Sequence, residues 1–217
     1  WWMHNNFLVD RGGKISKSRG GFTTLFSLVD AGVHPLAYRL LCLSAHYRSE
    51  LEFSGEIVAT ALTRLKRLVM AVEALRAAAG EPAGDLDAVH PRLCEELAGF
   101  DAALRDDLNT VKALTHLESA VAMKKVPVPD KLAVALKMDE ALGLKLATIT
   151  RADLRVRPKD AVIGEAEIEA ELDRRQQARA DRDFATSDAI RDALAARGVE
   201  VMDGDPLRWE WRVALEG

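Results

Sequence analysis

Residues 54–75 read SGEIVATALTRLKRLVMAVEAL, and this stretch decides the fold class of the chain. From Ile57 to Leu75 the apolar residues recur at steps of three and four, which is the spacing of one helix face. Ser54 stands where an N-cap is expected, because its hydroxyl can accept a backbone N–H of the first turn. We therefore predict a long amphipathic helix after Ser54, whose apolar face needs other helices to cover it.

Shorter stretches with the same periodicity lie on both sides of this helix. Gly32 and Gly143 each follow such a stretch, as glycine does just past a helix end. Pro127 and Pro129 remove backbone donors and are expected to hold residues 124–129 extended. The further helices that we predict span residues 23–31, 35–46, 91–107, 111–122 and 131–142. Helices joined by short breaks indicate an antiparallel bundle, so the fold class is mainly α.

The last third of the chain changes in character. Residues 151–159 hold four basic residues and one acid, and we interpret them as a linker. From Gly164 the sequence is highly charged and helical up to Gly198. Residues 199–202 and 209–212 then alternate as strands do, around a turn at residues 203–206. We predict a helical pair closed by a small β-hairpin.

Composition bounds the possible function. The 217 residues carry a net charge of −4 and are 48% apolar and 6% aromatic, which argues against a uniformly basic nucleic-acid binder but not against local basic patches. An apolar run long enough to span a membrane is absent from the sequence, so we expect a cytoplasmic protein and no membrane partner. Cys42 and Cys94 lack metal-ligand spacing, so we predict two buried reduced thiols and no metal site.

Near the start of the sequence, Lys14-Ile15-Ser16-Lys17-Ser18 lies between two pairs of glycines. Glycine adopts backbone angles closed to other residues, so this stretch is expected to be a mobile loop. Two ammonium groups three residues apart can meet one anion, which suits the phosphates of a nucleotide during phosphoryl or nucleotidyl transfer. The alternative is a solvated basic loop on the surface.

Several blocks occur in a fixed order along the chain. They are Trp2-Met3-His4-Asn5, the lysine loop of residues 14–18, Leu43–Ser49, Asp106–Thr110, Asp183-Phe184 with Asp188–Asp192, and Gly198–Asp203 followed by Trp209. Together they resemble the C-terminal half of a cysteinyl-tRNA synthetase. The lysine loop resembles the KMSKS sequence of class I aminoacyl-tRNA synthetases, with Ile15 in place of Met.

The resemblance implies ATP-dependent attachment of cysteine to tRNA(Cys). Lys14 and Lys17 would be catalytic, and would bind ATP (with Mg²⁺) together with Ser16 and Ser18. The implied division is 1–22 for the end of the nucleotide-binding catalytic domain, 23–53 for a connecting helical segment, 54–150 for a tRNA-binding bundle, 151–163 for the linker and 164–217 for the anticodon-binding domain. The family's HIGH-type ATP motif and zinc ligands are absent from this sequence. We expect both, with the zinc, in a missing N-terminal half.

By position, the resemblance assigns anticodon recognition to Arg179, Phe184, Asp188, Asp203 and Trp209. Unpaired bases can stack on an aromatic ring, arginine can bind guanine in a bidentate manner, and aspartate can accept from the cytosine amino group. In the alternative interpretation the aromatic residues are core and the acids are solvated. The hairpin also carries Trp211, so which tryptophan stacks stays open.

The sequence leaves four hypotheses about function. The chain begins with Trp1 rather than Met, so we expect a fragment that is inactive alone and serves as part of a cysteine–tRNA ligase. The second reading is a stand-alone tRNA-binding fragment without catalytic activity. The third, a cysteine ligase acting on a small amino sugar, is disfavoured by residues 164–217, because that family lacks an anticodon domain. The fourth is a purely structural helical protein, which the lysine loop argues against.

Overall fold

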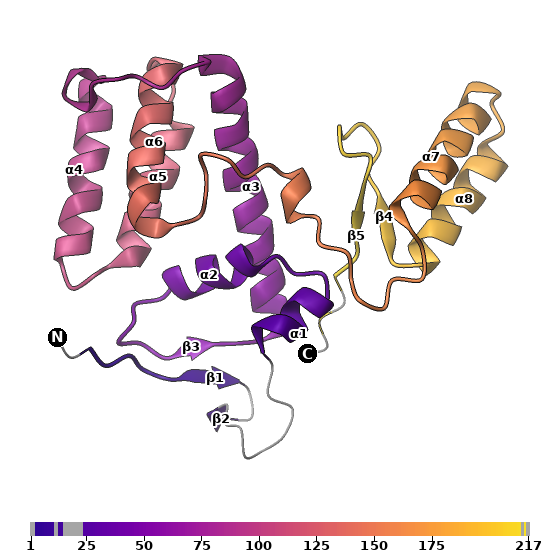
Figure 1. Ribbon diagram of the computed structural model, residues 1–217, viewed down its shortest axis with the longest axis horizontal. Coiled ribbons are helices and arrows are strands. Elements are labelled where there is room, and N and C mark those ends of the chain that lie inside the picture. The colour runs from indigo at the N-terminus through magenta and orange to yellow at the C-terminus, as the bar shows by residue number, and fades with distance from the viewer. Residues whose placement is uncertain (1–2, 11–12, 15–23, 214, 216–217) are drawn as a thin grey trace. The chain divides into compact units, whose positions relative to one another are not determined.

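The computed structural model describes residues 3–10, 13–14, 24–213 and 215. Their contacts separate two compact units. The helical unit comprises the described residues up to Lys14 together with residues 35–154, and the terminal unit comprises residues 24–34 and 155–215. Each unit is built mainly from helices, so the predicted mainly-α fold class is confirmed (Figure 1).

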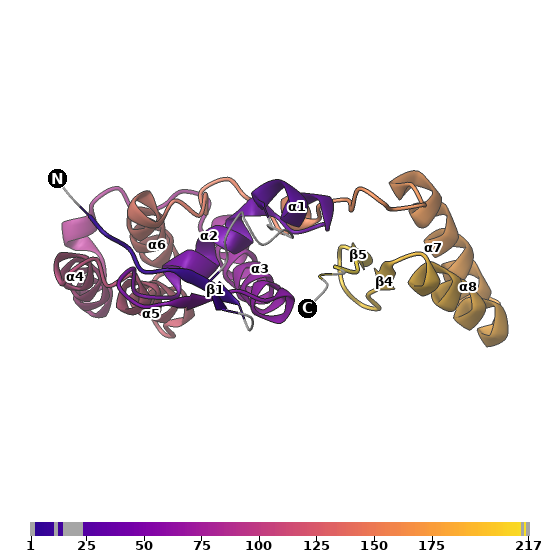
Figure 2. The ribbon, with the colours of Figure 1, turned by 90° about the horizontal axis from the view of Figure 1, so that it is seen from below.

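In the helical unit, the long helix α3 is the element that most of the others cover. The α-helices of this unit are α2 (Pro35–Leu43), α3 (Gly55–Ala79), α4 (Pro91–Arg105), α5 (Thr110–Ala122) and α6 (Val128–Leu142). Short 3-10 turns lie at η2 (Leu86–Ala88) and η3 (Ala152–Leu154). Ser54 Oγ accepts the Ile57 N–H at 3.3 Å, so the predicted N-cap is confirmed. The apolar face of α3 is buried against α2 and α6, and α4 packs along α5 (Figures 1 and 2).

Helix α6 differs at its start from the sequence-based expectation. It begins at Val128, three residues before the predicted Lys131, because Pro129 lies in the first turn, where the missing proline N–H has no intrahelical partner to lose. Its end is as predicted: Gly143 is left-handed with φ +64°. The buried Asp139 carboxylate then accepts the Leu144 and Leu146 N–H groups, each at 2.7 Å, which fixes the chain as it leaves the helix.

A small sheet precedes the bundle, in the order β2-β1-β3. Strand β1 (Leu8–Asp10) pairs antiparallel with β2 (Gly13–Lys14) and parallel with β3 (Leu51–Glu52). Strand β1 therefore lies shortly before the lysine loop, and β3 lies in the connection between α2 and α3.

In the helical unit, the block Leu43–Ser49 contacts the block Asp106–Thr110, and both carry the sequence resemblance. Asp107, at the turn between α4 and α5, accepts the Tyr47 hydroxyl at 2.5 Å and Arg48 Nε at 2.8 Å. The backbone of Asp107 is left-handed, with φ +54°. Because residues 47 and 48 also receive hydrogen bonds from Asn6, this turn is joined to the segment that leads into β1.

The terminal unit is a helical pair with a hairpin, as predicted. It contains α1 (Leu25–Asp30), α7 (Glu165–Ala180), α8 (Phe184–Ala196), β4 (Val199–Val201) and β5 (Trp209–Trp211). The strands are antiparallel, with Val199 opposite Trp211 and Val201 opposite Trp209. Their inward side chains form the core with residues of the helical pair, namely Ile163, Ile168, Leu172, Ile190, Leu194, Val199, Trp209 and Trp211.

Residues 24–34 pack with the terminal unit rather than with α2. The Lys159 N–H donates to the Asp30 carbonyl at 2.8 Å, and the Lys159 ammonium lies 3.6 Å from the Asp30 carboxylate. Contacts thus divide the segment 23–53 that was expected to act as one connection. The functional domain boundaries given above stay predictions.

The cysteines depart from expectation. Cys42 is exposed and Cys94 is half-buried, and both are free thiols. The prediction of two buried thiols is therefore wrong, because Leu40 and Leu41 take the core-facing positions of α2 and turn Cys42 outward. Within the described ranges, none of the helices combines the length and the apolar character needed to cross a bilayer.

Candidate functional site

The hairpin of the terminal unit has a turn whose backbone is held by its own hydrogen bonds. The Met202 N–H donates to the Arg208 carbonyl at 2.7 Å, and the Arg208 N–H donates to the Asp205 carbonyl at 2.9 Å. Gly204 and Arg208 both have left-handed backbones, with φ +79° and +63°. The turn therefore presents Asp203 at a fixed place beside α7.

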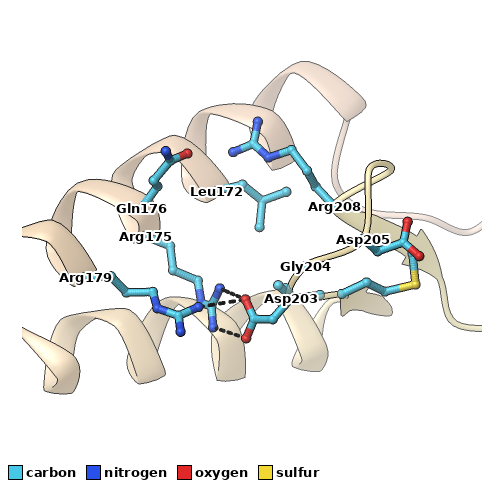
Figure 3. A pocket seen from close by; sticks show the side chains of 10 residues that line it. Leu172, Arg175, Gln176, Arg179, Asp203, Gly204, Asp205 and Arg208 are labelled. Atoms are coloured by element: carbon cyan, nitrogen blue, oxygen red, sulfur yellow. Dashed lines mark hydrogen bonds and ion pairs between the residues drawn. The ribbon is translucent and has the colours of Figure 1, made fainter.

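Two arginines of α7 converge on the Asp203 carboxylate, as Figure 3 shows. Arg175 binds both oxygens, with Nη1 at 2.6 Å from Oδ1 and Nη2 at 2.9 Å from Oδ2. Arg179 Nη1 lies 2.9 Å from Oδ1. The Arg175 side chain is buried, at 8% exposure, whereas Arg179 and Asp203 are half-exposed at 50% and 53%.

These contacts determine the charges of Asp203 and Arg175. Hydrogen bonds from Arg175 lower the pKa of Asp203, and the positive charges of Arg175 and Arg179 lower it further. The Asp203 hydrogen bonds raise the pKa of Arg175, with a smaller contribution from Asp188. Asp203 is therefore a carboxylate at neutral pH, with part of its surface open to solvent.

A pocket of about 300 Å³ opens beside this carboxylate. It is lined by Leu172, Arg175, Gln176, Arg179, Val201, Met202, Asp203, Gly204, Asp205 and Arg208. The Arg208 guanidinium binds Glu169 at 2.9 Å and Asp173 at 2.8 Å, so it is neutralised by α7. Donors and acceptors in fixed positions around a small pocket can match the polar edge of a flat heterocycle.

Helix α8 carries Phe184 and Asp188, two of the residues that the resemblance assigns to anticodon recognition. Asp183 caps it by accepting the Thr186 N–H at 3.0 Å. Hydrogen bonds from the Thr186 side chain and then from its backbone N–H lower the pKa of the Asp183 carboxyl. Phe184 follows and is 63% exposed, whereas Ile190 further along the helix is buried. Asp188 lies four residues after Phe184, on the same side of the helix, and its carboxylate is 3.3 Å from Arg191. The ring of Phe184 is thus open to a stacking partner.

Trp209, in contrast, is fully buried. Its indole N–H donates to Glu169 Oε1 at 2.6 Å, the Arg155 guanidinium lies 3.8 Å from the ring centroid, and Trp211 meets it edge-on at 5.1 Å. A cation on the ring face and a second indole at the edge enclose the ring. In this arrangement neither Trp209 nor Trp211, which is 5% exposed, presents a face for stacking.

The lysine loop can be placed only at its first residue. The backbone of Lys14 belongs to β2, opposite Val9, while Ser16, Lys17 and Ser18 lie outside the described residues. Over the part of the chain that the structure describes, His, Cys, Asp and Glu side chains form no group that could hold a metal ion.

The resemblance named both Arg179 and Asp203, which the structure places in contact, but it did not name Arg175. The available signal was spacing, because residues four apart share a helix face, so Arg175 lies one turn before Arg179. A second missed residue is Glu169, which binds Trp209 and Arg208 at once.

Comparison with known proteins bears on this pocket directly. The family model of the cysteinyl-tRNA ligase anticodon binding domain matches residues 165–212, which contain α7, α8 and the hairpin. A cysteine–tRNA ligase of Novosphingobium aromaticivorans is 58% identical over 98% of the chain, and one of Zymomonas mobilis is 47% identical over 98%. The chain matches the C-terminal portion of the cysteine–tRNA ligase family.

The resemblance predicted from the sequence is thus confirmed. A third relative, from Deinococcus radiodurans, is 34% identical over 97% of the chain. The chain spans less than half the length of these ligases, namely 43%, 46% and 44% of them. The match to the ligases extends over both units, whereas the anticodon-binding match lies in the terminal unit alone.

Proposed function

We propose that this chain supplies the tRNA-binding portion of a cysteine–tRNA ligase, and that the terminal unit binds the anticodon of tRNA(Cys). The observation that carries the proposal is the ionised, half-exposed Asp203 beside Arg179, within the residues that match the anticodon binding domain. The relatives named cysteine–tRNA ligase support the same assignment. Such a role in protein synthesis belongs to the cytoplasm.

The chemistry of the pocket suits an unpaired base. Asp203 can accept from a base amino or imino group, and Arg179 can donate two parallel hydrogen bonds to guanine. We assign base stacking to Phe184, which is exposed, and a further polar contact to Asp188. We assign Trp209 a supporting role instead, because its ring and its N–H are already occupied inside the hairpin core.

The catalytic part of the proposal concerns the lysine loop. Lys14 and Lys17, with Ser16 and Ser18, would contact the phosphates of ATP and its Mg²⁺, and the lysines would stabilise the leaving pyrophosphate. We expect the 217-residue chain to show no cysteine-dependent pyrophosphate exchange, because its sequence holds neither a HIGH-type motif nor the family's zinc ligands. Robust exchange by the purified chain would contradict this expectation.

A mobility-shift titration tests the tRNA assignment. The chain is titrated against tRNA(Cys), and against the same tRNA with a replaced anticodon, at one fixed salt concentration, because phosphate contacts make affinity salt-dependent. We expect tighter binding of the natural anticodon, and loss of that preference in Asp203→Asn. Asp160→Asn, an exposed acid of the linker, is the matched control and should behave as the parent chain. Equal binding of both tRNAs by the parent chain refutes base recognition.

The second candidate function is a stand-alone tRNA-binding protein without catalysis. The observation favouring it is that the family model covers the terminal unit, whereas the candidate ATP-contacting residues belong to a separate stretch of the chain. Binding of tRNA(Cys) with anticodon preference, together with absence of ATP-dependent chemistry even in the presence of the remaining portion of such a ligase, would favour it over an enzyme part.

A further inference from the structure

We propose that Arg175 is a positioning residue, which holds the Asp203 carboxylate in the orientation for base recognition, while Arg179 is the exchangeable partner that RNA displaces. This inference rests on the proposed function and deepens it. It gives the two arginines of α7 different tasks, although both contact the same carboxylate.

The geometry of Arg175 is that of a fixed clamp. Its two terminal nitrogens meet the two Asp203 oxygens in parallel, at 2.6 and 2.9 Å. A guanidinium fork of this kind fixes the plane of a carboxylate as well as its position. Arg175 is buried while the Asp203 side chain is 53% exposed, so the clamped carboxylate keeps a surface that solvent or a ligand can reach.

Arg175 occupies this place at a cost to folding. Its Nε is buried and has no hydrogen-bond partner among the residues that the structure describes. An unpaired buried donor is unfavourable, and an apolar side chain of similar length would avoid that penalty. Asp203 is half-exposed and keeps Arg179, so the fold does not require a guanidinium at residue 175. The Arg175 guanidinium instead holds the Asp203 carboxylate in one position and orientation.

Arg179 differs from Arg175 in the number of hydrogen bonds to Asp203 and in exposure. It makes one hydrogen bond to Asp203 and is half-exposed, and it lies one helical turn further along α7. Its guanidinium can leave Asp203 and donate to a base edge or a phosphate, while Arg175 keeps the carboxylate in place. Figure 3 shows both guanidinium groups on one side of the pocket, meeting at the same carboxylate.

A double-mutant cycle separates positioning from direct contact. Affinity for tRNA(Cys) is measured by mobility shift for the full chain, for Arg175→Lys, for Asp203→Asn and for the double variant. Lysine keeps the charge but cannot bind both oxygens in parallel, so we expect Arg175→Lys to weaken binding about 5- to 150-fold, the range for loss of one oriented polar contact. In the Asp203→Asn background the same change should have no further effect.

Two controls accompany the cycle. Arg174→Lys changes the neighbouring, exposed arginine, which pairs with Glu171, and should leave affinity within about 2-fold. Arg175→Met removes the guanidinium and its unpaired Nε, and we expect it to keep the melting temperature of the parent chain within a few degrees while it loses affinity as Arg175→Lys does.

Several outcomes overturn the inference. If the losses from Arg175→Lys and Asp203→Asn add in the double variant, Arg175 acts independently of Asp203. If Arg175→Lys binds as tightly as the parent chain, the carboxylate needs no clamp. If Arg175→Met unfolds while Arg174→Lys does not, Arg175 is structural. Failure of the proposed function looks different: the parent chain itself would not distinguish tRNA(Cys) from the anticodon-replaced tRNA.

Discussion

The exposure of Phe184 allows a sharp prediction, because stability and RNA affinity should respond differently to its removal. Phe184→Ala deletes the ring that stands at the start of α8 with 63% of its surface exposed. If this ring stacks on an anticodon base, the variant loses affinity for tRNA(Cys) while the terminal unit stays folded.

The magnitudes follow from burial. Truncation of a fully buried phenylalanine costs about 3–5 kcal/mol. Only about a third of Phe184 is buried, and alanine has the higher helix propensity by roughly 0.5 kcal/mol. We therefore expect a loss of stability of about 0.5–1.2 kcal/mol. Stacking of one base on an aromatic side chain is worth about 1–3 kcal/mol, which corresponds to roughly 5- to 150-fold in the dissociation constant.

Trp209→Ala is the matched contrast. Its indole is fully buried and hydrogen-bonded to Glu169, so its removal should cost the terminal unit about 3–5 kcal/mol of unfolding free energy. Urea unfolding followed by circular dichroism, and mobility shift with tRNA(Cys), are measured for both variants. Near-parent affinity of Phe184→Ala would refute the stacking assignment. Near-parent stability of Trp209→Ala would refute the placement of Trp209 in the core.

Three further predictions concern stability. Asp139→Ala leaves two buried backbone N–H groups without their acceptor, so thermal unfolding should show a loss of about 2–4 kcal/mol; a loss under about 0.5 kcal/mol would contradict the cap. Gly143→Ala forces a left-handed alanine and should cost about 1–2 kcal/mol, whereas Gly84→Ala, with open space around it, should be near neutral; equal effects would contradict the strain argument. Asp203 has a lowered pKa in the folded chain, so its contribution to stability is present above the unfolded-state pKa and is lost as pH falls through the folded-state value. Acid unfolding curves of the parent chain and of Asp203→Asn should therefore converge at low pH, and constant separation down to the lowest pH would contradict the pairing with Arg175.

Periodicity and helix-end residues were enough to predict most of the fold. The apolar steps from Ile57 to Leu75 describe a face that is indeed buried along most of α3, and Gly143 ends α6 as expected. The start of α6 was misplaced because proline can begin a helix as well as interrupt one, and the sequence does not say which. Helix faces and helix ends depend on residues that are close in the sequence, so rules based on sequence spacing can predict them.

The site was harder to predict, since it depends on contacts between distant residues. Arg175 and Asp203 are 28 residues apart and meet only when the hairpin folds against α7. Phe184 and Trp209 were both assigned to anticodon recognition, but Phe184 is exposed whereas Trp209 is enclosed by Arg155 and Trp211. Burial of an aromatic ring is a tertiary property, which a residue's position in the chain does not fix.

The distribution of charge explains how a chain of net charge −4 can suit RNA. In the terminal unit the acids have particular arginine partners: Arg208 binds Glu169 and Asp173, while Arg175 binds Asp203. The pocket therefore combines fixed donors and acceptors without a large excess of positive charge. Such a site favours selection among bases over strong attraction to any phosphate backbone.

The most direct test of the account is a nuclease footprint of tRNA(Cys) bound to the 217-residue chain, repeated with Asp203→Asn at a concentration that restores the same bound fraction. We predict that the parent chain protects the anticodon nucleotides and that the variant protects them less, with other protected positions unchanged. Protection that leaves the anticodon fully open to cleavage, or that is identical in the two proteins, would contradict the claim that this carboxylate reads an RNA base.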